Sequence, residues 1–366
     1  MDCPHIPELG HRDFSRLIYV KAAQSRVPVK GSFELTSCCN LRCKHCYVGD
    51  YRGENLNPRS ELSFEQWRVL FDQVADAGTL WVLLTGGEPL LHPDFARIYS
   101  YVHTKGFILT LFTNGTVLTP RILDLLSEKP PFSIEISLYG LTQETYERVT
   151  GIPGSHTRCM KGIEALLERG LPLQLKTMVL NLNRHELWGM RDYARDLGVR
   201  FRYDPMIHGA IDGTLDCLNY RLSPEEVVAL DVEDVERFTA WQELREEVNA
   251  KRIPSEYLYT CNAGIVSYHI DATGQLSLCI ASRTQTYDLC KGTFDLGWEF
   301  LRHVRYQLRQ NESLCGTCSL RPLCGVCPEW ANLEKVSPDV PVGYLCEVGH
   351  LRKRVLFQLK EVHDDR

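Results

Sequence analysis

Four cysteines stand within nine residues near the start of the chain, in the segment TSCCNLRCKHCY that spans residues 36–47. Three of them, Cys39, Cys43 and Cys46, have the spacing C-x3-C-x2-C. Three thiolates in one short loop can hold three irons of a [4Fe–4S] cluster, which leaves the fourth iron open to another ligand. Cys38 is predicted to be a bystander, because its neighbour Cys39 has the required spacing.

Zinc is the alternative metal for this loop. Structural zinc sites are closed by four ligands, commonly arranged in pairs, so His45 would have to complete the set. The three-cysteine spacing favours the iron–sulfur cluster, and in that interpretation His45 is an ordinary loop residue.

A second group of cysteines lies in the last third of the chain. Its members are Cys261, Cys279, Cys315, Cys318, Cys324, Cys327 and Cys346. Four of these have the spacing C-x2-C-x5-C-x2-C, which also fits a zinc ribbon. The first residues, MDCPHIPELGHRDF, lack the basic and apolar regions of a signal peptide. We therefore expect a cytoplasmic protein, in which clustered cysteines bind metal more often than they form disulfides.

Composition excludes some classes of partner. The chain has 366 residues, 44% of them hydrophobic and 24% charged, with a formal net charge of -6. That charge gives no general attraction to nucleic acid or to anionic membranes, and no apolar run is long enough to span a bilayer. The acidic stretch at residues 225–236 is predicted to be a solvated helix face or a linker.

Strand-like and helix-like segments alternate between residues 32 and 207. Apolar strands are predicted at 32–37, 80–87, 108–115, 132–140, 172–181 and 199–207. Amphipathic helices are predicted at 62–78, 93–106, 119–129, 157–170 and 184–198. Such alternation indicates an α/β fold with a parallel sheet covered by helices, either doubly wound or a partial barrel. Loops at the carboxyl ends of the strands build the active site in both, and the first cysteine loop follows the first strand.

The alternation ends after residue 207. A connecting loop is predicted at 208–226, one or two helices at 223–252, and a basic amphipathic helix at 350–362. The cysteine-bearing region between them has weak periodicity and thin apolar content, so it is expected to need metal in order to fold.

Four motifs in this order resemble those of the radical S-adenosylmethionine (radical SAM) enzymes. CNLRCKHCY is similar to the family's cluster signature, and TGGEPLLHPDF (85–95) to its glycine-rich motif after the second strand. FTNGT (112–116) and ISLYG (136–140) are similar to its motifs on the third and fourth strands. The resemblance covers residues 32–207 and implies a partial (β/α)6 radical SAM barrel, which we place at 31–210 after an N-terminal segment at 1–30.

The resemblance also implies contacts to SAM. The implied SAM-binding residues are Tyr47, Gly86, Gly87, Glu88, Asn114, Ser137 and Arg148. The glycines would let the backbone pair with the amino group, and Glu88 would accept a hydrogen bond from the ammonium or the ribose. Ser137 and Arg148 would hold the carboxylate, and Tyr47 would border the adenine. A reduced cluster would then cleave SAM to methionine and a 5′-deoxyadenosyl radical, which takes a hydrogen atom from a substrate.

The second group of cysteines resembles the SPASM extension, which carries auxiliary [4Fe–4S] clusters and is placed at 257–350. Residues 211–256 would be a linker with helices, and 351–366 a C-terminal helix. The family pattern implies one auxiliary cluster on Cys315, Cys318, Cys324 and Cys346 and another on Cys261, Cys279 and Cys327. The second set has only three members, with Cys290 as the nearest spare thiol. The segment CGVC departs from the pattern, because relatives commonly have three residues between these two cysteines.

The family's chemistry predicts a radical SAM oxidoreductase that acts on a ribosomally made peptide. Ile280 stands directly after Cys279 where sulfatase-maturing relatives have an aspartate, which argues against that activity. About thirty residues precede the first strand, too few for a leader-binding winged helix, so a separate leader-recognition protein or direct binding is expected. A flavodoxin or ferredoxin would donate the electron. The alternatives are the same chemistry on a small molecule, such as a haem precursor or a cofactor, and an iron–sulfur electron carrier without catalysis.

Overall fold

The structure is a computed structural model that describes residues 10–49, 61–249, 256–309, 314–334 and 337–358. Six parallel strands follow one another in the order of the sequence. They are β1 (Lys30–Glu34), β2 (Trp81–Thr85), β3 (Ile108–Thr113), β4 (Ser133–Ser137), β5 (Leu173–Met178) and β6 (Arg200–Asp204). The predicted α/β fold with a parallel sheet is confirmed.

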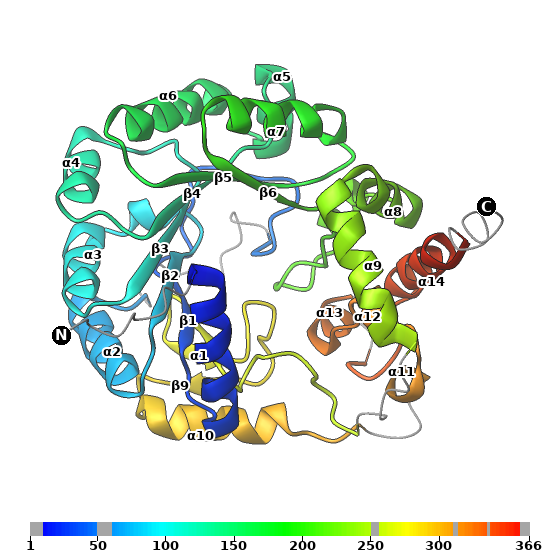
Figure 1. The fold of residues 1–366 in the computed structure, drawn as a ribbon. Helices are drawn as coiled ribbons and strands as arrows, with labels where there is room; N and C mark the ends of the chain where they lie inside the picture. The colour runs from blue at the N-terminus through cyan, green and yellow to red at the C-terminus, as the bar shows by residue number, and fades with distance from the viewer. Residues whose placement is uncertain (1–9, 50–60, 250–255, 310–313, 335–336, 359–366) are drawn as a thin grey trace, which may run out of the picture.

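Helices cover the outer face of this sheet in an arc (Figure 1). They are α2 (Phe64–Asp76), α3 (Phe95–Thr104), α4 (Pro120–Glu128), α5 (Gln143–Thr150), α6 (Ser155–Glu168) and α7 (Leu187–Asp196). The Ser63 side chain accepts from the Gln66 backbone, and the two residues form the predicted capping box of α2. The short helix α5 was not predicted, because its sequence is strongly polar.

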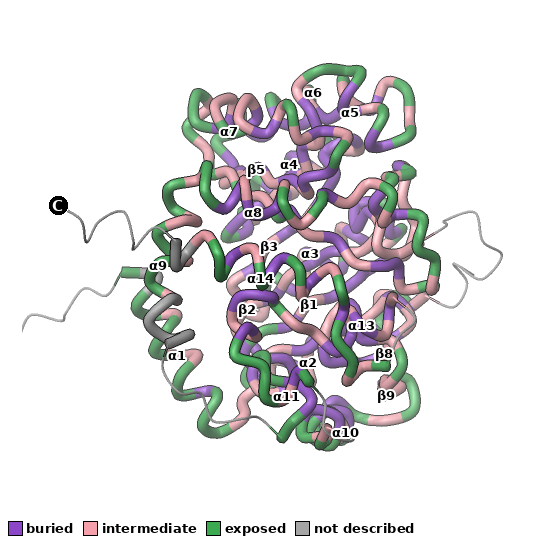
Figure 2. Tube along the Cα trace, turned by 90° about the vertical axis from the view of Figure 1, so that its right-hand side faces the viewer, coloured by how far each residue is buried: buried purple, intermediate pink, exposed green. Residues whose placement is uncertain are grey.

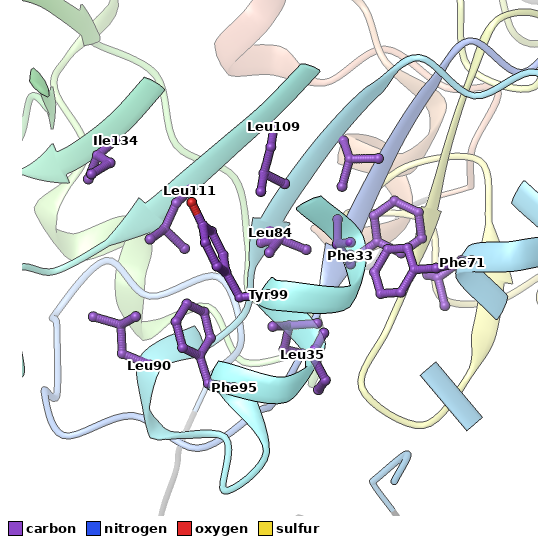
Figure 3. Packing of buried hydrophobic residues seen from close by; sticks show 14 of the residues in the cluster. Phe33, Leu35, Phe71, Leu84, Leu90, Phe95, Tyr99, Leu109, Leu111 and Ile134 are labelled. Carbon is purple, nitrogen blue, oxygen red and sulfur yellow. The ribbon is translucent and has the colours of Figure 1, made fainter. Parts of the chain in front are cut away.

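The core lies between the strands and these helices. Along β3 every second residue is buried, so Leu109 and Leu111 face the helices while Phe112 faces the opposite side. Figure 3 shows Leu111 beside Tyr99 of α3, and the surrounding side chains are apolar. In Figure 2 the buried residues follow the strands and the inward faces of the helices. These helices do not cover the opposite face of the sheet, so its side chains can line a site.

The sheet continues beyond the barrel strands. β7 (Ser267–Ile270) pairs in parallel with β1, and β8 (Gln275–Ser277) and β9 (Tyr287–Asp288) follow in antiparallel order. The sequence missed them because strands of two to four residues are too short to show an alternating pattern. Their presence ties the cysteine-bearing region directly to the first strand of the barrel.

The remaining helices lie outside the alternation. They are α1 (His11–Ser25), α8 (Pro224–Glu233), α9 (Val235–Asn249), α10 (Phe294–Arg305), α11 (Leu314–Thr317), α12 (Arg321–Cys324), α13 (Pro328–Leu333) and α14 (Gly343–Gln358), with short 3-10 turns η2 (Pro89–Leu91), η3 (Arg184–Glu186) and η4 (Asp216–Tyr220). The helix predicted at 350–362 therefore begins earlier, and its last residues lie outside the described part of the chain. Among the described residues, no helix combines the length and the apolar character that crossing a bilayer requires.

The prediction of a solvated acidic face at 225–236 is wrong at Asp231. This side chain in α8 is 2% exposed and pairs with Arg237 at 2.6 Å and with Arg352 of α14 at 2.8 Å. Arg352 lies 121 residues from Asp231 in the sequence, so a local charge pattern could not reveal that pairing. The buried ion pair between Asp231 and Arg352 attaches α14 to α8.

Candidate active site

The first cysteine loop is fixed to the end of α5 by backbone hydrogen bonds. The amides of Arg42 and Lys44 donate to the carbonyls of Thr150 and Val149 at 2.8 and 2.9 Å. The amide of Cys46 donates to the carbonyl of Cys43 at 3.1 Å, which closes a turn inside the loop. The loop thus has a defined path at the carboxyl end of β1, although it contains no regular helix or strand.

The glycine-rich loop after β2 packs directly on the cysteine loop. The amides of Gly87 and Glu88 donate to the carbonyls of Thr36 and Cys38, both at 2.8 Å. A Cβ atom on Gly86 would lie 2.4 Å from the Thr36 carbonyl oxygen. The motif predicts that these glycines admit the SAM amino group. The close approach present in the structure is to the cysteine loop itself.

We expect Gly87→Ala to lower the iron content of the chain. A Cβ atom there would lie 2.4 Å from the carbonyl oxygen of Cys38 and 2.5 Å from that of Ser37, so the cysteine loop would have to move. Such overpacking costs about 1–3 kcal/mol. Iron analysis after anaerobic reconstitution checks it, with Gly343→Ala as the control because nothing lies within 4 Å of a Cβ atom there. Equal iron content in both variants would contradict the prediction.

A pocket of about 450 Å³ opens at the carboxyl ends of the barrel strands. The residues on its barrel side that matter for chemistry are Cys39, Cys43, Cys46, Tyr47, Gly86, Gly87, Asn114, Ser137, Tyr139 and Lys176. Its far side includes Ile280 and Trp330 from the cysteine-bearing region. The structure therefore brings together five of the seven predicted SAM contacts, with Glu88 and Arg148 as the exceptions described below.

The three cysteines of the motif line this pocket and are half-buried. Burial raises the pKa of Cys39 to about 12, and burial and the neighbouring thiolates hold the pKa of Cys43 well above its usual range. As thiolates they would need a strong positive charge beside them, which a bound metal supplies. Their chemistry fits iron.

A single metal ion is a poorer description of the site than a cluster. In the described part of the chain, no three His, Cys, Asp or Glu side chains are close enough together to hold one ion. A [4Fe–4S] cluster has several irons, each with its own thiolate, so its ligands do not have to meet at one point. Three thiols spread along one pocket wall suit that larger group.

Glu88 joins the loops after β2 and β3. Its two carboxylate oxygens accept hydrogen bonds from the hydroxyl of Thr113 at 2.8 Å and from the amide of Asn114 at 2.7 Å. Burial raises the pKa of Glu88 to about 7 in spite of these bonds. In the described structure its side chain does not line the pocket. The bonds to the third-strand motif are therefore its observed contacts.

Asn114 contacts the cluster motif directly. Its amide nitrogen donates to the Asn40 side chain at 2.9 Å and lies 3.9 Å from the sulfur of Cys39. The sequence placed Asn114 at the end of the third strand, but only the structure reveals that it orients a cysteine of the motif.

Ser137 and Lys176 form a polar pair on the pocket wall. They are partners in the register of β4 and β5, and both line the pocket. Lys176 lies over the ring of Phe112 and 3.9 Å from Glu135, and burial holds its pKa well below the usual range. Lys176 is not among the predicted SAM contacts, although a lysine inside the apolar strand PLQLKTMVLN is a usable signal.

Arg148 is not brought to the pocket. It lies on α5 with an exposed side chain that donates to the carbonyl of Leu182 at 2.8 Å. Arg148 was predicted as a SAM contact because of its spacing from Ser137, and that spacing did not account for the extra helix α5. The cations that do line the pocket are Lys176 and Arg202.

A buried charge network connects the cysteine loop to β7. Glu34 accepts from the Tyr47 hydroxyl at 2.8 Å and from Arg283 at 3.0 Å with both oxygens, and it lies 3.6 Å from His269. Burial alone would raise the pKa of Glu34, but His269, Arg283 and the Tyr47 hydrogen bond hold it at about 2. Arg283 also donates to the carbonyl of Ile280 at 3.0 Å. Tyr47 thus has an observed structural contact besides its predicted place beside the adenine.

One auxiliary set of cysteines gathers at a small cavity. Cys315, Cys318, Cys324 and Cys346 all line a cavity of about 40 Å³, although they come from α11, α12, the loop between them and α14. These are the four residues that the family pattern groups together. Four thiols around one cavity fit a cluster, whose irons each take a separate thiolate.

The second auxiliary set has three neighbouring thiols. Burial and the charges of Cys327 and Cys261 contribute to a pKa of about 12 for Cys279, so the three thiols act on one another. Cys290 lies elsewhere, with its sulfur 3.7 Å from the carbonyl of Thr273. Its charge neighbours are Asp288, Lys291 and Asp271. The structure therefore places Cys290 apart from this set.

Comparisons with known proteins agree with the arrangement of the barrel. The chain is 35% identical over 178 residues to "AdoMet-dependent heme synthase" of Methanosarcina barkeri, which is 48% of this chain and 50% of that protein. It is 32% identical over 200 residues to "Antilisterial bacteriocin subtilosin biosynthesis protein AlbA" of Bacillus subtilis, covering 54% and 44%. The chain spans about half the length of the curated relatives it matches.

The fold is similar to a solved structure over most of its length. Streptococcus suis SuiB bound to precursor peptide SuiA matches with a TM-score of 0.69 at 17% identity, covering 94% of this chain and 84% of that chain. This likeness concerns the fold. The family model "Radical SAM superfamily" matches residues 33–194, which hold the cysteine motif, the end of β1 and strands β2 to β5. These residues of the chain are therefore similar to the radical SAM superfamily.

Proposed function

We propose that this chain is a radical SAM oxidoreductase that removes a hydrogen atom from a peptide substrate. The observation that carries the proposal is the pocket that runs from Cys39, Cys43 and Cys46 to the cysteine-bearing region. When bound there, SAM and a [4Fe–4S] cluster supply the electron transfer and the 5′-deoxyadenosyl radical that such a reaction uses. A pure electron carrier would not need a pocket of this size beside its cluster.

The far wall of the pocket supports a role for the auxiliary cysteines. Ile280, which follows Cys279, and Trp330, three residues after Cys327, both line it. A substrate between the barrel wall and the far wall would lie close to the thiols of the first cysteine loop and to the auxiliary thiols Cys279 and Cys327. We assign residues 257–350 to a SPASM extension with one or two auxiliary [4Fe–4S] clusters, which could accept an electron from the substrate.

The relatives support a peptide as substrate. AlbA is named for the biosynthesis of a bacteriocin, and the SuiB structure contains its precursor peptide. The heme synthase match favours a second candidate, the same chemistry on a small molecule. A flavodoxin or ferredoxin would be the electron donor and a separate protein could present the leader of the peptide, in a cytoplasmic setting.

We expect Lys176→Met to weaken SAM binding about tenfold or more, because a charge-assisted hydrogen bond is worth about 1.5–3 kcal/mol. Lys176 faces the pocket beside Ser137, where together they can hold the SAM carboxylate. Arg148→Met is the matched control, since that cation is exposed on α5. Equilibrium dialysis of SAM against the reconstituted variants measures both affinities. A larger loss in Arg148→Met would restore the assignment made from the sequence.

The test of the proposed function is an anaerobic assay. The reconstituted chain receives SAM, a strong reductant and a candidate peptide, and 5′-deoxyadenosine and the peptide mass are followed by mass spectrometry. Formation of 5′-deoxyadenosine together with loss of hydrogen from the peptide supports the proposal. 5′-Deoxyadenosine with an unchanged peptide, but a changed haem precursor, would favour the small-molecule candidate. A chain that contains zinc without sulfide would contradict both.

A further inference from the structure

A buried carboxylate lies beside two of the three residues of the second auxiliary set. Glu329 of α13 stands two residues after Cys327 and is 2% exposed. The Ser282 hydroxyl donates to Glu329 at 3.1 Å, and the Ser282 amide donates to the carbonyl of Cys279 at 3.0 Å. Glu329 is therefore adjacent to Cys327 along the chain and connected to Cys279 through Ser282.

Neutral groups are the hydrogen-bond partners of this carboxylate. The hydroxyls of Tyr259 and Ser282 donate to Oε1, the second at 3.1 Å, and the Asn332 amide donates to Oε2 at 3.3 Å. No ion pair to Glu329 occurs within the described residues, whereas other buried carboxylates such as Asp231 and Glu34 have arginine partners. An ionised carboxylate can accept about four hydrogen bonds, so Oε2 keeps unused acceptor capacity.

Burial restricts the roles open to a carboxylate that, like Glu329, has no ion pair among the described residues. A buried charge is costly unless it is paired with an opposite charge or binds a metal. Carboxylates that bind metals are themselves held by hydrogen bonds from surrounding groups, as Glu329 is by Tyr259, Ser282 and Asn332. The adjacent thiols provide three of the four ligands that a [4Fe–4S] cluster usually has.

We propose that Oε2 of Glu329 is the fourth protein ligand of the auxiliary cluster held by Cys261, Cys279 and Cys327. The inference rests on the proposed function, because it requires that this set binds a cluster. It closes the incomplete set without Cys290, which the structure places elsewhere. It also means that this cluster has no iron open to substrate, so it serves in electron transfer.

Ligation by Glu329 would fix the orientation of α13. Cys327 is the residue just before the helix, and Glu329 lies in its first turn. The same helix carries Trp330, which lines the pocket. Ligation by both Cys327 and Glu329 would therefore anchor the start of α13 and hold the Trp330 side chain against the substrate space.

The test uses the full chain in which Cys39, Cys43 and Cys46 are replaced by alanine, so that signals come from the auxiliary clusters alone. This parent is expected to hold about eight irons for two clusters. Adding Glu329→Gln should remove about one iron per chain and produce the electron paramagnetic resonance signal of an oxidised [3Fe–4S] cluster, because a neutral amide is a poor iron ligand. Glu329→Cys should restore the iron and shift the spectrum of the reduced cluster.

Glu334→Gln is the matched control. This second carboxylate lies at the end of the same helix, 2.6 Å from both Arg221 and the Trp330 indole nitrogen. It should change neither the iron content nor the spectrum.

The possible results distinguish a failure of the Glu329 ligand assignment from a failure of the proposed function. An iron-replete parent whose content and spectrum are unchanged by Glu329→Gln would overturn the ligand assignment and leave the proposed function standing. If Glu329→Gln fails to fold, the cysteine variant decides: restored iron with a shifted spectrum supports ligation, and an unshifted spectrum or a misfolded chain overturns it. A parent without iron and sulfide would overturn the auxiliary clusters, and the ligand with them.

Discussion

Replacing Cys43 by alanine is expected to reduce 5′-deoxyadenosine formation to the background of a sample without reductant. Cys43 is half-buried and lines the pocket together with Cys39 and Cys46. Its loss leaves two thiolates, which is too few to retain a cluster that uses three of them. The variant should also contain about four irons fewer than the wild-type chain.

Cys38→Ala is the control in the same loop and should keep both activity and iron. In the described structure Cys38 does not line the pocket, and the contacts made by Cys38 come from its backbone. Its amide donates to the Thr36 hydroxyl at 3.1 Å and its carbonyl accepts from Glu88, and alanine can make both bonds. If Cys38→Ala removed the activity and Cys43→Ala did not, the three-cysteine assignment would be wrong.

The order of the motifs predicted that their residues lie close together, because parallel strands end at a common edge. Cys39, Gly87 and Asn114 follow β1, β2 and β3. Ser137 is the last residue of β4, and all four line one pocket. Their proximity follows from topology, which the alternation of strands and helices already indicates. Local spacing was sufficient for this part of the prediction.

The roles of individual side chains were harder to predict because they depend on contacts between distant segments. Glu88 points to Thr113 and Asn114, and Arg148 is carried outward by a helix that the sequence did not reveal. The Glu34 network needs Arg283, which lies 249 residues away in the sequence. No periodicity or motif encodes such a pairing, so it becomes visible only when β7 is placed beside β1.

That network also provides a prediction about stability. Arg283→Met should lower the free energy of unfolding by about 3–5 kcal/mol at neutral pH, because removing one partner of a buried ion pair leaves the other charge uncompensated. The charge left behind is that of Glu34, whose side chain is 10% exposed. Arg302→Met is the control: its ion pair with Glu299 has side chains that are 58% and 51% exposed, so it should cost less than about 1 kcal/mol.

The dependence on pH should distinguish the charge network from simple packing. The pKa of Glu34 is held at about 2 in the folded chain, below its ordinary value of 4.5. Its stabilisation is therefore complete above pH 4.5 and is lost as the pH falls toward 2, a total of about 3 kcal/mol at about 1.4 kcal/mol for each unit of pKa. Urea unfolding between pH 6 and pH 3 measures the slope, which should be steeper in the wild type than in Arg283→Met.

A second readout of Arg283→Met connects stability to the site. Arg283 binds the Ile280 carbonyl and Glu34, and Glu34 binds the Tyr47 hydroxyl. Since Tyr47 follows Cys46 and Ile280 follows Cys279, the network sets the distance between the two walls of the pocket. We expect Arg283→Met to retain 5′-deoxyadenosine formation while coupling it less tightly to substrate conversion. If the ratio of modified substrate to 5′-deoxyadenosine matches that of Arg302→Met, the network acts on stability alone.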